Sequence, residues 1–319
     1  MPRATEPTQD VRTGTSRFLI ALLARLIAAA AAFAPLPLPA VIGGALDDSG
    51  QFPGVGSVTR VDDTGKVLGI FSGVLISPNL ALTAAHVVCG SAKCKPVESN
   101  YRFNLALDSG PVTLRIAEVV VHSGFAGFTP GTDGLIHNDL ALLRLSTPAP
   151  VAGYPIAHMH LGNELTLVGH GTFGAFGAPP NGASVTLRHY GTNVFDHALA
   201  PDVYGFDATA DGSSGVQLAG GDSGGPAFIR RAGQYYLAGI NTFVFTAKGS
   251  AVPGDAPLNG GGGMRLVAYV PWLRQVTGGS ARDARMPSAG AVTASNLVAG
   301  DGLRRPRAPQ PILRPHSMD

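Results

Sequence analysis

Three short segments of this chain carry residues that together could perform acyl transfer. Ser223 stands in the glycine-rich run Gly-Gly-Asp-Ser-Gly-Gly-Pro, His86 follows Thr-Ala-Ala, and Asp139 precedes the apolar run Leu-Ala-Leu-Leu. A serine hydroxyl is a weak nucleophile at neutral pH and needs an adjacent base, which a histidine supplies. An acid drawn close to the core needs a partner, because burying an unpaired charge is costly. The segments therefore predict a nucleophile, a general base and a carboxylate that orients the base.

The glycines around Ser223 suit the same chemistry. They let the chain turn sharply and let a substrate approach the backbone. Acyl transfer also needs backbone N–H groups aimed at the developing oxyanion, and we expect those of Gly221 and Ser223 to form this oxyanion hole. A lone Gly-Asp-Ser-Gly is equally compatible with a simple turn, so the nucleophile interpretation depends on the other two segments.

The elements that must position these residues are predicted to be short strands. Between residues 41 and 275, β-rich runs alternate with Gly, Pro, Asn and Asp, which is typical of a barrel or sandwich. Only residues 266–276 resemble a short closing helix, and Pro271 falls inside it. The clearest strand candidates are Gly73–Ser77, Val112–Ile116, Glu118–Val121, Leu140–Leu145, Leu165–Val168 and Tyr235–Ile240.

The length allows one large domain or two small ones, and the composition can bury a substantial core. Of the 319 residues, 45% are hydrophobic and 14% charged, and 43 glycines with 25 prolines favour many turns between strands. The net charge of +2 is too small to argue for a nucleic-acid partner. We expect a monomer that acts on a protein or peptide and needs no cofactor.

Both ends of the chain are predicted to lie outside the fold. Residues 1–17 are polar, and an almost wholly apolar run from Phe18 to Ala34 is broken by Arg25. Together with the small residues that follow, this indicates that residues 1–40 are a signal peptide with a possible short propeptide. A membrane anchor is less well supported, because a spanning helix needs about 20 clean apolar residues. We therefore expect a secreted or periplasmic protein without stable membrane insertion; residues 276–319, rich in Gly, Pro and Arg, are predicted to be a flexible tail.

The chain has two cysteines, Cys89 and Cys94. Their short spacing in a turn-like stretch predicts a local disulfide in an oxidising compartment, and two free thiols are the alternative. Two cysteines alone make a poor zinc site, and His158 and His160 have no carboxylate cluster beside them in the sequence. No metal site is predicted.

The three segments resemble the chymotrypsin/trypsin family of serine proteases, whose triad follows the same order of His, Asp and Ser. Further runs are similar to landmarks of that family: Val41-Ile-Gly-Gly44, Gly169-His-Gly-Thr172 and Tyr269-Val-Pro-Trp272. The resemblance covers about residues 41–275. It implies an all-β fold of two antiparallel six-stranded barrels, divided near residue 155, with a short C-terminal helix and the active site between the barrels.

The resemblance also implies an activation mechanism. In the family, a freed N-terminal amine pairs with the Asp before the nucleophile and orders the oxyanion hole, which gives the pair Val41 and Asp222 here. The residue before Val41 is Ala40 rather than a basic residue. Our hypothesis is that signal peptidase cuts after Ala40; a cut near Ala34 followed by trimming is the alternative.

Specificity is inferred by position within the family pattern. The pocket floor falls on Gln217, which is neutral, and the pocket-lining segment falls on Thr242, Phe243 and Val244. The opposite wall falls near residues 261–263. Val244, in place of the usual glycine, should narrow the pocket, so small or medium uncharged P1 residues are predicted rather than Lys or Arg.

The chain departs from the family pattern in two cysteine positions, which are Val87 and Ala219 here. We interpret this as a loss of rigidity and not of activity. The main alternative function is a catalytically silent relative that acts as a binding protein. A serine esterase of another fold would show a parallel αβ pattern, and its catalytic His would follow the Ser.

Overall fold

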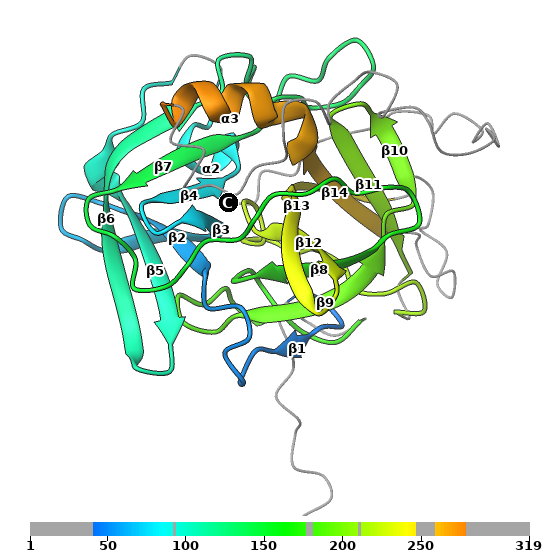
Figure 1. Ribbon diagram of the computed structural model, residues 1–319, viewed down its shortest axis with the longest axis horizontal. Helices are drawn as coiled ribbons and strands as arrows, with labels where there is room; N and C mark the ends of the chain where they lie inside the picture. The colour runs from blue at the N-terminus through cyan, green and yellow to red at the C-terminus, as the bar shows by residue number, and fades with distance from the viewer. Residues whose placement is uncertain (1–40, 92–93, 177–180, 210–211, 247–258, 279–319) are drawn as a thin grey trace, which may run out of the picture. The chain divides into compact units, whose positions relative to one another are not determined.

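The computed structural model describes residues 41–91, 94–176, 181–209, 212–246 and 259–278. The predicted signal peptide and nearly all of the predicted tail lie outside these residues. Figure 1 shows the strands of residues 55–145 on one side and the later strands on the other.

The first half is a closed barrel. Its hydrogen-bonded strand order is β2-β3-β4-β7-β6-β5, and every neighbouring pair is antiparallel. The strands are β2 (Val55–Val61), β3 (Val67–Ser77), β4 (Leu80–Thr83), β5 (Tyr101–Leu107), β6 (Gly110–Val121) and β7 (Ala141–Leu145).

The second half is an eight-stranded sheet in the order β1-β9-β8-β12-β13-β14-β11-β10. The predicted all-β, chymotrypsin-like fold class is therefore confirmed, with a difference in detail. Six strands form the body of this sheet, and the short strands β1 and β10 extend it at either edge. The strands are β1 (Ala45–Leu46), β8 (Glu164–Gly169), β9 (His189–Val194), β10 (His197–Ala200), β11 (Val203–Ala208), β12 (Pro226–Arg231), β13 (Gln234–Thr246) and β14 (Asn259–Arg265).

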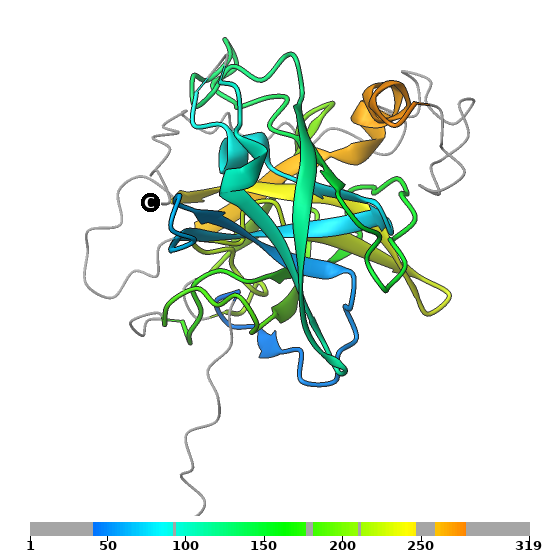
Figure 2. The same cartoon turned by 90° about the vertical axis from the view of Figure 1, so that its left-hand side faces the viewer.

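The closing helix forms where it is predicted, in two parts. A 3-10 turn, Leu266–Tyr269, leads into α3 (Val270–Val276). Pro271 is tolerated because it lies in the first turn, where its missing N–H would have no helical acceptor. The ring of Trp272 in α3 lies 5.0 Å from that of His122, which follows β6. The helix therefore packs against the first barrel. Figure 2 shows α3 nearly end-on.

Hydrophobic side chains are buried in both halves, and the larger of two clusters spans them. One cluster fills the barrel with Phe103, Leu105 and Leu142 and continues to Phe228 and Leu237 of the second sheet. The other lies within the second sheet. Because the larger cluster includes side chains of both halves, packing itself holds the two halves together.

A buried ion pair reinforces this junction. The guanidinium of Arg188, just before β9, contacts the carboxylate of Asp47 at 2.7 Å, and both side chains are almost fully buried. The same guanidinium donates to the carbonyl of Val55 in β2. The carboxylate also accepts the N–H groups of Gln51 and Phe52. Arg188 therefore links the segment around β1 to the barrel.

Replacing Arg188 by methionine is expected to destabilise the protein by about 3–5 kcal/mol, because Asp47 would remain buried without its cation. Urea denaturation of wild type and Arg188→Met measures the difference. Arg60→Met, at an exposed position of β2, is the control and should change stability by less than about 0.5 kcal/mol. Equal stabilities of wild type and Arg188→Met would contradict the prediction.

Candidate active site

His86 lies at the junction of a strand and a helical turn. Strand β4 ends at Thr83, the fully buried Ala84 and Ala85 follow, and α2 (Ala85–Val88) begins there. Small residues let this segment pack tightly, and only 7% of the His86 side chain is exposed. Its ring Nδ1 lies 2.7 Å from a carboxylate oxygen of Asp139, and its backbone N–H donates to the other oxygen at 2.8 Å. The two predicted residues are therefore in direct contact.

Hydrogen bonds of the preceding residue, Asn138, fix the backbone at Asp139. Asp139 is 1% exposed and precedes β7. Asn138 has a left-handed backbone (φ 59°), and its side chain donates to the carbonyl of Gly124. Its N–H donates to the hydroxyl of Tyr269. These bonds fix the backbone from which the carboxylate extends toward His86.

Ser223 lies in a tight loop against the first barrel. Gly221 and Gly224 have φ angles of 91° and 83°, which suit glycine rather than other residues. A Cβ at Gly224 would lie 2.1 Å from the hydroxyl of Thr83 and 2.2 Å from the carbonyl of Ser72. The loop with Ser223 therefore packs on the end of β4, directly before His86.

A cluster of polar side chains around His137, two residues before Asp139, was not anticipated from the sequence. The ring of His137 lies between two carboxylates, with Nδ1 3.0 Å from Asp202 and Nε2 2.9 Å from Asp133. Tyr269 donates to Asp202 at 2.7 Å. Burial lowers the pKa of His137, but the hydrogen bonds to the two carboxylates outweigh it, and the pKa is raised overall. Asp202 is far from His137 in the sequence, and no local pattern connects them.

Asp222 is fully buried beside the loop. Its carboxylate accepts the N–H groups of Gly171 and Ala219 at 3.0 and 2.9 Å. In the part of the chain that the structure describes, no cation contacts it. Burial therefore raises its pKa to about 7, against the lowering effect of the two backbone donors.

The segment that begins at Val41 reaches this same region. Val41 is fully buried in one hydrophobic cluster with Leu218. Ile42 pairs with Gln217, whose N–H donates to the Ile42 carbonyl at 3.0 Å. Val41 has a φ of 57°, a strained backbone conformation for a β-branched residue.

The predicted pocket segments lie side by side in the second sheet. Val244 of β13 pairs with Gly261 of β14, and Phe243 pairs with Gly262. A Cβ at Gly261 would lie 2.8 Å from the ring of Phe206 and 3.1 Å from the side chain of Leu218. The apolar side chains of Phe206 and Leu218 therefore occupy the space next to Gly261.

Cys89 and Cys94 form the predicted disulfide, which closes the short loop after α2. Among the described residues, no group of three or more His, Cys, Asp or Glu side chains could hold a metal ion. Within the same residues, no helix has the length and apolar character needed to cross a membrane.

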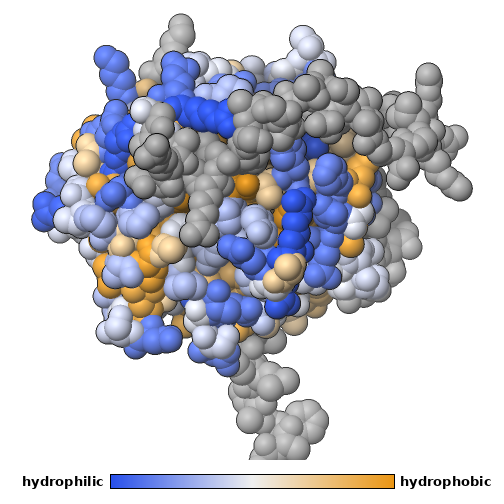
Figure 3. Space-filling model, in the orientation of Figure 1, coloured by the Kyte–Doolittle hydropathy of each residue, from blue (hydrophilic) through white to orange (hydrophobic). Residues whose placement is uncertain are grey.

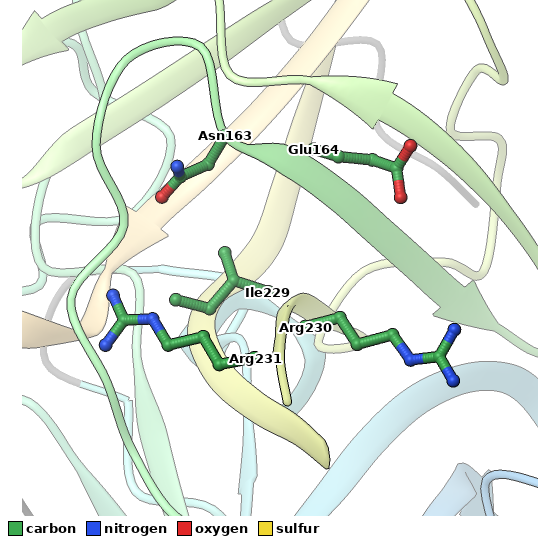
Figure 4. Close-up of a pocket in the computed structure, with 5 residues that line it drawn as sticks. All are labelled: Asn163, Glu164, Ile229, Arg230 and Arg231. Carbon is green, nitrogen blue, oxygen red and sulfur yellow. The ribbon is translucent and has the colours of Figure 1, made fainter. Parts of the chain in front are cut away.

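A surface hollow of about 150 Å³ lies elsewhere, between the start of β8 and the end of β12. Figure 4 shows its lining residues, with Asn163 and Arg231 on one side and Glu164 and Arg230 on the other. None of them is a predicted site residue. On the face in Figure 3, hydrophobic residues form groups separated by hydrophilic ones.

Comparison with known proteins agrees with this arrangement. The Trypsin family matches residues 41–257, so the chain belongs to the trypsin family. It is similar to brachyurin of Leptuca pugilator, with 28% identity over 65% of this chain and 87% of that protein. It is also similar to trypsin-1 of Astacus astacus (28% identity; 56% and 79%) and to the venom peptide isomerase heavy chain of Agelenopsis aperta (24% identity; 73% and 98%).

The environment of Asp222 predicts how pH affects the stability of the full chain. Because the pKa of about 7 in the folded state exceeds the ordinary value of 3.8 for an aspartate, the folded state holds this proton more tightly. The associated stability is fully present below about 3.8 and is lost as pH rises through about 7. The free energy of unfolding, measured by urea denaturation between pH 4 and 8, should therefore fall more steeply with pH in wild type than in Asp222→Asn. Parallel profiles would contradict this prediction.

Proposed function

We propose that this chain is a serine endopeptidase that hydrolyses peptide bonds with a triad of His86, Asp139 and Ser223. The observation that carries the proposal is the buried contact between His86 and Asp139 in a chain of the trypsin family. The packing of the Ser223 loop on the strand end before His86 supports it.

In this mechanism the Ser223 oxygen attacks the scissile carbonyl carbon, and its proton passes to Nε2 of His86. The tetrahedral intermediate collapses to an acyl-enzyme as the C–N bond breaks, and His86 returns the proton to the leaving amine. Water, deprotonated by His86, then releases the acid and restores Ser223. Asp139 favours the tautomer with the proton on Nδ1, which leaves Nε2 as the base, and it stabilises the imidazolium that forms.

The proposed oxyanion hole consists of the N–H groups of Gly221 and Ser223. Gly221 has a positive φ, which other residue types adopt only at an energetic cost. The loop conformation that presents these two N–H groups therefore depends on a glycine at this position. Preorganised donors of this kind stabilise the negative charge that develops on the substrate carbonyl oxygen.

Activation is proposed to require a free amine at Val41 that pairs with Asp222. Two observations support it: Asp222 is buried with no cationic partner among the described residues, and Val41 is buried in a strained conformation. Cleavage between Ala40 and Val41 would remove that constraint on Val41 and create the missing cation. The proposed route to this cut is export with a signal peptide at residues 1–40, to a secreted or periplasmic location.

The protease domain is proposed to span residues 41–275, with halves divided near residue 155, a tail beyond it and a monomeric state. Its substrate pocket is proposed to involve Gln217, Thr242, Phe243 and Val244. Phe206 and Leu218 support a preference for small or medium uncharged P1 residues, because these apolar side chains occupy the space above Gly261.

A fluorophosphonate probe tests the proposed activity. The full chain is expressed in an exporting host, and the secreted protein is measured by intact mass spectrometry before and after the probe. One adduct is expected on wild type and none on Ser223→Ala. Asp139→Asn should label more slowly, by a factor of roughly 10⁴, the size typical of this change in such a triad.

The unlabelled mass separates the possible failures. No adduct on a protein that begins at Val41 would contradict the peptidase and favour the silent binding protein. No adduct on a longer form would contradict activation by the export cut alone. An adduct on an enzyme that begins elsewhere would contradict the proposed pair of Val41 and Asp222.

Peptide substrates that differ only at P1 test the pocket. Substrates with Ala or Val at P1 are expected to exceed those with Arg or Lys in kcat/KM by about 100-fold or more, because none of the proposed pocket residues is acidic and a buried cation without a partner is costly. Steady-state hydrolysis of the series is the measurement. A preference for Arg or Lys would overturn the proposed specificity.

A further inference from the structure

Ser72 of β3 lies in the first barrel, yet both hydrogen bonds of its hydroxyl to described residues reach the second half. It is fully buried, and Oγ donates to the carbonyl of Gly221 at 2.8 Å. The same oxygen accepts the N–H of His170 at 2.9 Å. The hydroxyl therefore acts both as a donor and as an acceptor at the junction of the two halves.

The backbone of Ser72 makes two further bonds at the same place. Its N–H donates to the carbonyl of Ser223 at 2.9 Å, and its carbonyl accepts the hydroxyl of Thr83 at 2.8 Å. Ser72 therefore contacts the carbonyls of both residues whose N–H groups form the proposed oxyanion hole.

Within the described residues, each carbonyl from Gly220 to Ser223 accepts a hydrogen bond. The N–H groups of Thr172, Gly225 and Ser72 donate to the carbonyls of Gly220, Asp222 and Ser223, respectively. The fourth carbonyl, that of Gly221, is bound by the Ser72 hydroxyl. This is the only one of the four bonds that comes from a side chain, so a substitution can remove it alone.

Two hydrogen bonds hold the peptide that joins Gly221 to Asp222. One is local, from the Asp222 N–H to the carbonyl of Ala219 at 3.1 Å; the other, from the Ser72 hydroxyl, ties this peptide to the first barrel. A glycine has little backbone preference of its own, and Gly221 and Gly224 lie at either end of the short turn. Because each peptide unit is planar, fixing the Gly221 carbonyl fixes the plane that joins Gly221 to Asp222. The donors of Gly221 and Ser223 lie on the peptide planes on either side of it.

We propose that Ser72 is a positioning residue for catalysis: its hydroxyl orients the Gly221–Asp222 peptide so that the N–H groups of Gly221 and Ser223 converge on one oxyanion. This inference rests on the proposed function. It predicts that the hydroxyl matters more to the transition state than to substrate binding.

Ser57 provides a matched control. It lies directly opposite Ser72 on β2 and is also fully buried. Its hydroxyl likewise donates to a backbone carbonyl of the later part of the chain, that of Val185, at 3.0 Å. Val185 is not a predicted site residue, so Ser57→Ala reports what a buried serine contributes to the fold alone.

The test compares wild type, Ser72→Ala and Ser57→Ala as processed full chains. Measured quantities are kcat and KM on one peptide, the inhibition constant of a peptidyl boronate and stability to urea. A boronate bound to Ser223 presents a tetrahedral oxyanion, whereas KM reflects mostly the ground state. Ser72→Ala is expected to lower kcat and weaken the boronate by about 10- to 100-fold with KM within about twofold, because removing an oxyanion donor itself costs about 10²–10³. Ser57→Ala is expected to lose stability but to keep kcat within about twofold.

Equal losses of kcat in the two variants, or wild-type kcat in Ser72→Ala, would overturn the inference. Should Ser72→Ala not fold, Ser72→Cys replaces it, because a thiol is nearly isosteric but a weak hydrogen-bond partner. With the new thiol verified free by alkylation, it should show the same selective loss of kcat, and wild-type kcat would overturn the inference. A wild type beginning at Val41 with neither peptidase activity nor boronate binding would instead refute the proposed function, and this inference with it.

Discussion

The close approach of two backbones at Gly224 is the constraint on which the candidate site depends. No side chain fits there, because the carbonyl of Ser72 and the hydroxyl of Thr83 occupy the space. Through this contact the loop that carries Ser223 packs against the first barrel, next to the end of β4 that leads to His86. The larger hydrophobic core, which spans both halves, and the ion pair of Arg188 hold the halves in that relation.

Two buried carboxylates near this contact have different electrostatic environments. Asp139 accepts the backbone N–H of His86, and its other carboxylate oxygen lies 2.7 Å from the ring Nδ1. Asp222 accepts only backbone donors among the described residues, and burial raises its pKa. A buried charge must be paired or neutralised. The first carboxylate therefore has a partner in His86, whereas the second has no cationic partner among the described residues.

Local sequence patterns predicted much of the fold. The runs Gly73–Ser77 and Leu140–Leu145 lie in or along barrel strands, and residues 266–276 form the closing turn and helix. Alternating apolar residues and turn residues act over a few positions, so they can be read locally. The contact of His86 with Asp139 was also anticipated, because each carries a recognisable segment. The short edge strands β1 and β10 were not, since two to four residues carry too little pattern.

The sequence by itself determined the residue types available for catalysis, their order along the chain and the β-rich class that presents them. Only the tertiary structure decided which ordinary residues support them. Ser72 is one serine among many, and the strands from β7 to β10 separate His137 from Asp202 in the sequence. Hydrogen bonds between such residues depend on where the two halves meet, and no short-range pattern encodes that meeting. The chemistry of a side chain follows from the local sequence, whereas the orientation of that side chain depends on long-range packing.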